Sequence, residues 1–272
     1  MTIGQSRQGS PGFTLIEILT VVSITALLLA EFLPALKEAR ERSRCGVCLS
    51  NMHQLANAFA TYVAENHAYP IWGLGQAEYF CNYAWGGKTN QLAWKDYEDG
   101  IFYIKAKDRP LNRMFLAGKP SEPDPITSDR QRAELPVYHC PSDDGHWTPR
   151  PGWGQWMAAY SDVGTSFLIN DHWMEQAWPK PDLYGRWVEW GANLMKRRAV
   201  KGASRFVLLE EGSAQVSIRE RIELMGFHRR WAKHNMLMLD GHAATFRIVQ
   251  RELDRPPYPH GPAWTVFDEY AD

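Results

Sequence analysis

The sequence lacks the short motifs that mark the common classes of enzyme. It contains no glycine-rich phosphate loop, no nucleophile elbow and no His-Glu-x-x-His pair of a zinc protease. Net charge is scarce too, because 30 Lys and Arg nearly balance 31 Asp and Glu, and the formal charge of -1 gives no bulk attraction to polyanions. We therefore expect no catalytic activity, and we do not expect nucleic acid as a partner.

Cysteine is sparse, with four residues in 272: Cys45, Cys48, Cys81 and Cys140. Their separations fit no common zinc finger or ribbon, and Cys45-x-x-Cys48 lies in a segment of helical periodicity rather than at a thioredoxin-type junction. In an exported domain, four cysteines predict two disulfides, for which three connectivities exist. A bridge between Cys45 and Cys48 strains its own geometry, so we expect cross-links from the helix to the rest of the domain.

Long hydrophobic runs are also scarce, and the main one lies near the N-terminus. Residues 18–30 are free of charge and carry only three mildly polar side chains. At a rise of about 1.5 Å per residue this run spans roughly 20 Å, which is less than the roughly 30 Å of a bilayer core. A span over residues 13–36 is long enough, but it brings Glu17 into the lipid and Glu31 to the outer interface.

Two ordinary interpretations of this segment are a cleaved secretory signal peptide and an uncleaved membrane anchor. A signal peptide would be cut near Ala30, but no pair of small residues marks that position. The carboxylate of Glu17 at the start of the apolar run costs about 3 kcal/mol on insertion scales, which also argues against a signal peptide. The uncleaved anchor remains an alternative.

Beyond the apolar run, the chain continues without a helix breaker. Met52, Leu55 and Phe59 recur at helical spacing, which predicts that residues 37–66 form an amphipathic continuation of the same helix. The alternative is two helices separated near Gly46.

The string Gly12-Phe13-Thr14-Leu15-Ile16-Glu17 resembles the processing site of the prepilin family, which comprises type IV pilins and the pseudopilins of type II secretion systems. The resemblance extends to about residue 36. It implies that residues 1–12 are a leader and that a prepilin peptidase/N-methyltransferase cuts after Gly12 and methylates Phe13. It also implies that Glu17 pairs with the amino terminus of a neighbouring subunit during assembly, since a carboxylate in lipid requires a cation.

The resemblance further implies a pilin-like α+β fold. The helix, with its membrane half at 13–36 and its amphipathic half at 37–66, would pack on an antiparallel β-sheet in a globular domain at 67–272. The expected location is the inner membrane, crossed once, with the domain on the periplasmic side, or a cell-surface filament. The expected partners are the peptidase, other pilin or pseudopilin subunits and the inner membrane.

Near the C-terminus, two apolar stretches flank Asp240-Gly241, which predicts a β-hairpin with these residues at the turn. A subset of prepilin-like proteins ends with a His, nine further residues and Asp-Gly. Here eleven residues separate His228 from Asp240 and five separate His234 from it, so we interpret the difference as a two-residue insertion after His228. We expect Asp240 to cap the turn and the histidines to lie on strand or loop surfaces, with no metal site.

The same subset guides the pairing of the cysteines. Cys48-Leu49-Ser50-Asn51 and Cys140-Pro141-Ser142 resemble strings that are common in it. This resemblance favours a disulfide between Cys48 and Cys140 and another between Cys45 and Cys81.

The expected function is that of a structural or accessory (minor) subunit of a type II secretion pseudopilus or a type IV pilus-like assembly. The alternative is a membrane-anchored surface domain that uses prepilin export without polymerising and binds carbohydrate through Trp85, Trp94 or Trp153. We expect no cofactor. Calcium remains a candidate without assigned ligands, near an acidic set comprising Asp143, Asp144, Asp162, Asp171 and His172.

Overall fold

The computed structural model describes residues 14–70, 73–74, 79–119, 121–147, 156–171, 193, 195–197, 199–200, 202–220 and 222–248. Contacts divide the chain into two compact units, Met1–Ser43 and Arg44–Asp272. Each unit is described by itself. The predicted processing residues Gly12 and Phe13 lie outside the described residues.

Helix α1 (Leu15–Asn66) runs through 52 residues and passes Gly46 without a break. In the first unit its apolar side chains are exposed, from Leu15 at 83% to Leu28 at 60%. Among the described residues, α1 is the helix long and apolar enough to cross a membrane, with a mean hydropathy of 2.1 over 18 residues. None of that window is buried, so α1 is compatible with a single-pass membrane anchor.

The second unit contains a four-stranded antiparallel sheet in the order β5-β6-β7-β8. Its strands are β5 (Phe167–Ile169), β6 (Val207–Glu211), β7 (Lys233–Met238) and β8 (Ala243–Arg247), and helix α6 (Gly212–Glu220) directly follows β6. All five residues of β6 are buried, whereas β8, at one edge of the sheet, has exposed positions. A long apolar helix and an antiparallel sheet are together compatible with the α+β class.

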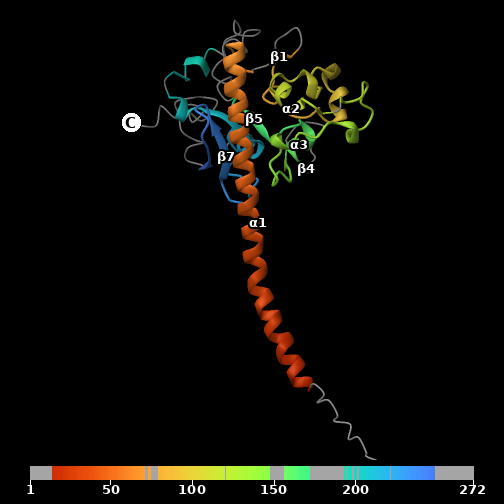
Figure 1. The fold of residues 1–272 in the computed structure, drawn as a ribbon, viewed down its shortest axis with the longest axis vertical. Helices are drawn as coiled ribbons and strands as arrows, with labels where there is room; N and C mark the ends of the chain where they lie inside the picture. The colour runs from red at the N-terminus through yellow and green to blue at the C-terminus, as the bar shows by residue number, and fades with distance from the viewer. Residues whose placement is uncertain are drawn as a thin grey trace, which may run out of the picture. The chain divides into compact units, whose positions relative to one another are not determined.

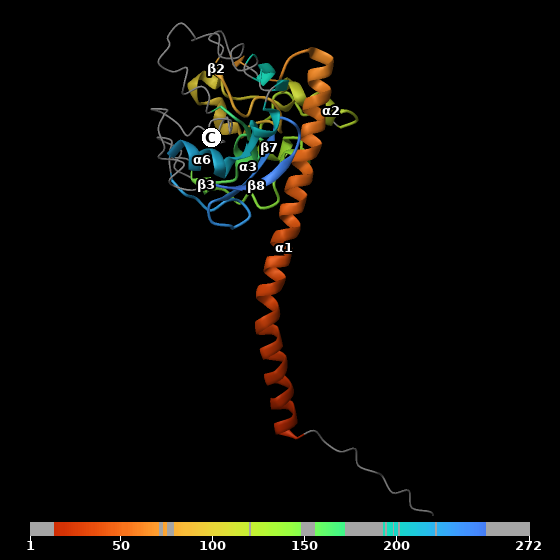
Figure 2. The same cartoon turned by 90° about the vertical axis from the view of Figure 1, so that its left-hand side faces the viewer.

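Within the second unit, the C-terminal part of α1 packs on this sheet (Figures 1 and 2). Met52, Leu55 and Phe59 recur on one face of the helix and are buried in a cluster that includes Leu209 and Leu237. Each such side chain contributes about 1.5–3 kcal/mol when it is removed from water. The amphipathic repeat in the sequence therefore determines which face of α1 meets the sheet.

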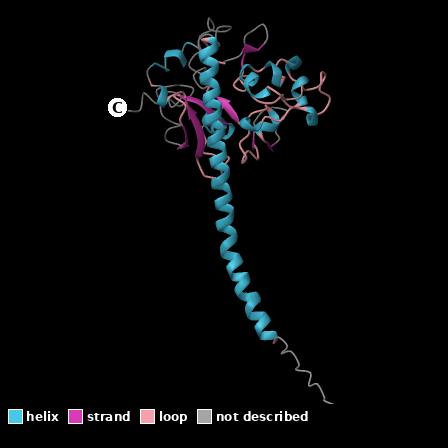
Figure 3. Ribbon diagram, viewed as in Figure 1, coloured by secondary structure: helices cyan, strands magenta, loops and turns pink. Residues whose placement is uncertain are grey.

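Irregular chain makes up most of the described residues between 81 and 170, as the loops and short helices of Figure 3 show. Its elements are η1 (Leu92–Lys95), η2 (Glu98–Gly100), η3 (Ala106–Asp108), η4 (Pro110–Asn112), α2 (Arg113–Leu116), η5 (Asp129–Gln131), η6 (Pro136–Tyr138) and α3 (Ala159–Asp162). Two-residue strands form the pairs β1 (Gly73–Leu74) with β2 (Tyr79–Phe80) and β3 (His146–Trp147) with β4 (Trp156–Met157), and η8 (Ala203–Arg205) precedes β6. These loops need internal partners for their backbone groups.

Arg109 supplies many of these partners from inside the domain. Its guanidinium is 1% exposed, and it donates to the carbonyl oxygens of Tyr83 and Gly86 at 2.6 Å each and of Val163 at 2.8 Å. It also donates to Oδ1 of Asn90. Burial lowers the pKa of Arg109 to about 10, so the group remains charged at neutral pH. One buried cation thus joins the stretch from Tyr83 to Asn90 to the segment at Val163.

Candidate functional site

At the start of α1, Thr14 and Glu17 cap the helix reciprocally. The backbone N–H and the hydroxyl of Thr14 donate to Oε2 of Glu17 at 2.8 and 2.7 Å, and the Glu17 N–H contacts Oγ1 of Thr14 at 3.3 Å. This is a capping box, and the Thr-x-x-Glu spacing is its sequence signal. Glu17 therefore has a local role in addition to the predicted pairing between subunits.

In the second unit, four reactive side chains converge where α1 meets the sheet. Cys48 comes from α1, Cys140 from the loop after η6, Glu211 from the end of β6 and His228 from the segment before β7. All four are buried, and one donor atom from each lies within 4.8 Å of all the others. We refer to these four residues as the buried cluster.

The distances between side-chain atoms in the buried cluster are short. His228 Nε2 lies 3.4 Å from Cys140 Sγ and 3.3 Å from Glu211 Oε1, and Cys48 Sγ lies 3.5 Å from the same Oε1. Burial raises the pKa of the Cys48 thiol well above its usual range. Burial opposes a charge on His228, but hydrogen bonds with Cys140 and Glu211 outweigh it and raise the pKa of His228. Without a metal, a proton on the imidazole thus balances the buried carboxylate.

Hydrogen bonds hold the Cys140 loop against α1. Asn51, one turn after Cys48, donates from Nδ2 to the carbonyl oxygens of Pro136 at 3.2 Å and His139 at 2.9 Å. The Cys140 N–H donates to Oγ of Ser166 at 2.9 Å. Both cysteine positions are thus fixed by polar contacts as well as by packing.

The predicted disulfide partners lie in different surroundings. All four cysteines are free thiols in this structure, and Cys48 and Cys140 belong to the buried cluster. Cys45 contacts the side-chain amide of Asn235 on β7, whereas Cys81 packs in a separate apolar cluster with residues that include Tyr83, Ile104 and Leu168. The structure thus brings together one of the two predicted pairs.

The histidines correct an expectation from the sequence. His228 and His234 were expected on strand or loop surfaces, but they are 5% and 0% exposed. His234 Nδ1 lies 3.0 Å from Oγ of Ser213, and burial lowers the pKa of His234 to about 4. His234 lies on β7, and both faces of this strand are buried. Its side chain is therefore covered whichever face it occupies.

Asp240 and Gly241 form the turn between β7 and β8. Strand pairing runs from Lys233 with Arg247 to Leu237 with Ala243. Gly241 has a φ of 93°, which is in the left-handed region that glycine adopts without strain. Asp240 Oδ1 accepts a hydrogen bond from the backbone N–H of His242 at 3.1 Å. Asp240 thus caps the turn, as the sequence predicts.

The acidic residues considered for calcium have other partners. Asp143 accepts hydrogen bonds from the Ser166 hydroxyl at 2.7 Å and from two backbone N–H groups, and burial raises its pKa to about 6. Asp162 accepts from the Trp94 ring N–H at 2.6 Å. Asp171 pairs with Arg219 at 3.1 Å. Each carboxylate therefore serves a separate local contact, and His172 lies outside the described residues.

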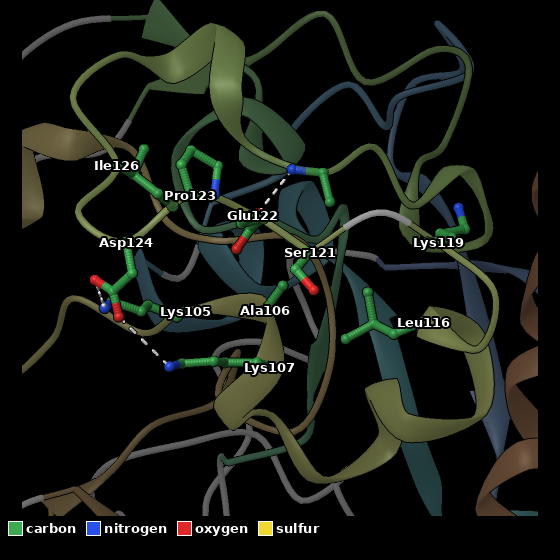
Figure 4. Close-up of a pocket in the computed structure, with 11 residues that line it drawn as sticks. Lys105, Ala106, Lys107, Leu116, Lys119, Ser121, Glu122, Pro123, Asp124 and Ile126 are labelled. Carbon is green, nitrogen blue, oxygen red and sulfur yellow. Dashed lines mark hydrogen bonds and ion pairs between the residues drawn. The ribbon is translucent and has the colours of Figure 1, made fainter.

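A surface pocket of about 190 Å³ lies beside η3 and the Glu122–Ile126 loop (Figure 4). Its polar groups already bind one another: Asp124 pairs with Lys105 at 2.7 Å and with Lys107 at 3.6 Å. Glu122 accepts from the backbone N–H of Ala133 at 2.7 Å. The volume is also below the roughly 300 Å³ at which ligand pockets begin. The buried cluster is therefore a stronger candidate site than this pocket.

Comparisons with known protein families, curated proteins and solved structures return no match to this chain.

Proposed function

We propose that this chain is made as a prepilin-like precursor and serves as a structural or accessory subunit of a type II secretion pseudopilus or a type IV pilus-like assembly. A prepilin peptidase would cut after Gly12 and methylate Phe13. The membrane half of the helix would then hold the chain in the inner membrane, with the domain on the periplasmic side. Other pilin or pseudopilin subunits are its proposed partners.

The observation that carries this proposal is the exposed apolar surface of α1 immediately after the processing string. In the described part of the first unit, large apolar side chains from Leu15 to Leu33 are more than half exposed. In water this surface would be costly, at about 25 cal/mol for each Å² of apolar area. Lipid or the helices of neighbouring subunits would cover it, which is the requirement of a pilin-like subunit.

The capping box complicates the interpretation of Glu17, and it also offers a way to test it. A Glu17→Gln variant retains a side chain that can accept the Thr14 bonds but loses the charge that a neighbouring amino terminus would bind. A Thr14→Ala variant loses the hydroxyl partner and keeps the carboxylate. We expect Glu17→Gln to be cleaved normally yet to enter filaments poorly, and Thr14→Ala to assemble. The opposite result, with Glu17→Gln assembling and Thr14→Ala entering filaments poorly, would assign Glu17 to helix capping alone.

Mass spectrometry of the mature N-terminus in the native host tests the processing step. The expected result is a chain that begins with N-methylated Phe13. A chain that begins near Glu31, or one that retains Met1, would overturn the prepilin assignment.

Two of the three tryptophans considered for carbohydrate binding are buried. Trp85 and Trp94 are 1% and 3% exposed, and each packs against other aromatic rings of the domain, so neither offers a ring face to a sugar. Trp153 lies outside the described residues. The described structure therefore contains no observation that favours this alternative over a structural subunit.

A further inference from the structure

The buried cluster has a donor set that is typical of a transition-metal site. Two thiols, one imidazole and one carboxylate suit Zn²⁺, whereas Ca²⁺ and Mg²⁺ select oxygen ligands. The four residues are at most 5% exposed. Four protein donors would fill a tetrahedral coordination sphere and leave no position for water or substrate, which is the arrangement of a structural rather than a catalytic zinc.

The distances fit the edges of such a tetrahedron. With Zn–S near 2.3 Å and Zn–N or Zn–O near 2.0–2.1 Å, tetrahedral angles give edges of about 3.6 Å from sulfur to nitrogen or oxygen, and about 3.3 Å from nitrogen to oxygen. The observed edges are 3.4 Å for Cys140 Sγ to His228 Nε2 and 3.5 Å for Cys48 Sγ to Glu211 Oε1. His228 Nε2 lies 3.3 Å from Glu211 Oε1. The donors are thus spaced for one ion at their centre.

Glu211 provides a second, independent observation. Its side chain is 0% exposed, and its Oε2 atom has no hydrogen-bond partner in the described part of the chain. A buried acceptor left in this state costs about 1–3 kcal/mol, and more when it is charged. A cation held by the carboxylate would remove this cost.

We propose that Cys48, Cys140, Glu211 and His228 bind one Zn²⁺ ion that fastens α1 to the sheet domain. Binding releases three protons to solvent, one from each thiol and one from the imidazolium of His228, which then ligates as the neutral ring through Nε2, and no electron is transferred. The two thiolates and the carboxylate exceed the charge of the ion by one. The amide of Asn235 donates to Cys48 Sγ at 3.4 Å and offsets part of that excess.

A disulfide between Cys48 and Cys140 is the competing state. It would draw the two sulfurs to about 2.05 Å and remove both thiolate ligands. Glu211 would then have only the imidazole of His228 as a charged partner in the cluster. The bridge and the metal site exclude each other, so the metal content and the number of free thiols decide between them.

The test uses the full chain, purified in detergent without a histidine tag under argon. Zinc is measured by mass spectrometry of the metal, and free thiols are counted in the same sample. Zinc is then exchanged for Co²⁺, whose absorption reports tetrahedral geometry and thiolate ligation. We expect one zinc per chain and four free thiols per chain after the metal is released. The cobalt-substituted protein should show a sulfur-to-metal charge-transfer band.

Two variants and one matched control assign the ligands. Cys140→Ser and Glu211→Gln should each weaken zinc binding by at least about a hundredfold, because even partners outside the ligand set are worth 10–100-fold. Cys81→Ser alters a buried cysteine in another cluster and should bind zinc like the unaltered chain.

The unaltered chain decides the outcome even if a variant fails to fold. Less than about a tenth of an equivalent of zinc after exposure to excess metal and washing would overturn the proposal. A Cys48–Cys140 disulfide in chain isolated from the native host would overturn it as well. Neither result bears on cleavage after Gly12, so this proposal and the proposed function fail separately.

Discussion

Replacement of Arg109 by lysine tests whether the irregular part of the domain depends on one buried cation. Arg109 makes four side-chain hydrogen bonds, three to the stretch from Tyr83 to Asn90 and one to Val163, and it is 1% exposed. The backbones of Gly87 and Gly164 close over it, since a Cβ at either position would lie 3.0–3.1 Å from the guanidinium nitrogens. The variant keeps the charge and changes only the reach and the number of donors.

The expected loss of stability follows from the number of acceptors that a lysine side chain would leave without a donor. A single ammonium reaches two of the four acceptors at best, and each buried acceptor left without a donor costs about 1–3 kcal/mol. We therefore expect Arg109→Lys to lower the free energy of unfolding by about 4 kcal/mol. In a domain of this size, Tm falls by about 2–4 °C for each kcal/mol of lost stability. The expected loss therefore corresponds to a decrease in Tm of roughly 10 °C.

The assay is thermal and urea unfolding of the full chain in detergent, followed by tryptophan fluorescence. Arg113→Lys is the matched control, because Arg113 lies four residues later with a side chain that is 49% exposed. This control should change stability by less than about 0.5 kcal/mol. If Arg109→Lys were no more destabilising than Arg113→Lys, the account of Arg109 as the organiser of the loops would be wrong.

Three further predictions concern pH, the turn and the metal. Because burial lowers the pKa of His234 from 6.5 to about 4, its contribution to stability should be fully present above pH 6.5 and should fall by about 3 kcal/mol as pH drops through 4. The pH dependence of urea midpoints checks this, and a His234→Gln variant that keeps the full acid loss would contradict it. Gly241→Ala should cost about 1–2 kcal/mol, since φ is 93° and the added Cβ meets only Ala56 at 3.6 Å, whereas Gly46→Ala in the middle of α1 should stabilise by about 0.5–1 kcal/mol. A destabilised Gly46→Ala or a neutral Gly241→Ala, measured by the same urea titration, would refute the backbone argument. Removal of zinc by a chelator should lower stability by about 4 kcal/mol if zinc is present at a thousand times its Kd, and an unchanged Tm would count against a structural metal.

Local sequence patterns were sufficient for the elements that local forces build. The charge-free run and the amphipathic repeat predict one helix that ends at Asn66, and the structure has that helix. Asp240-Gly241 predicts a hairpin because only particular residues tolerate a positive φ, and the turn is there. The Thr14-x-x-Glu17 cap was also present as a local signal. In each case the residues that determine the feature are neighbours in the chain.

Apart from the pair of Cys48 and Cys140, which the family resemblance favoured, tertiary structure decided which distant side chains meet. Cys48, Cys140, Glu211 and His228 come from a helix, a loop, a strand end and a turn segment, so their spacing in the sequence resembles no metal motif. Likewise, nothing near Arg109 in sequence indicates that loops up to Val163 close around it. The reason is physical: a buried polar group is stable only where several segments supply its partners at once, and those segments are brought together by burial of apolar faces.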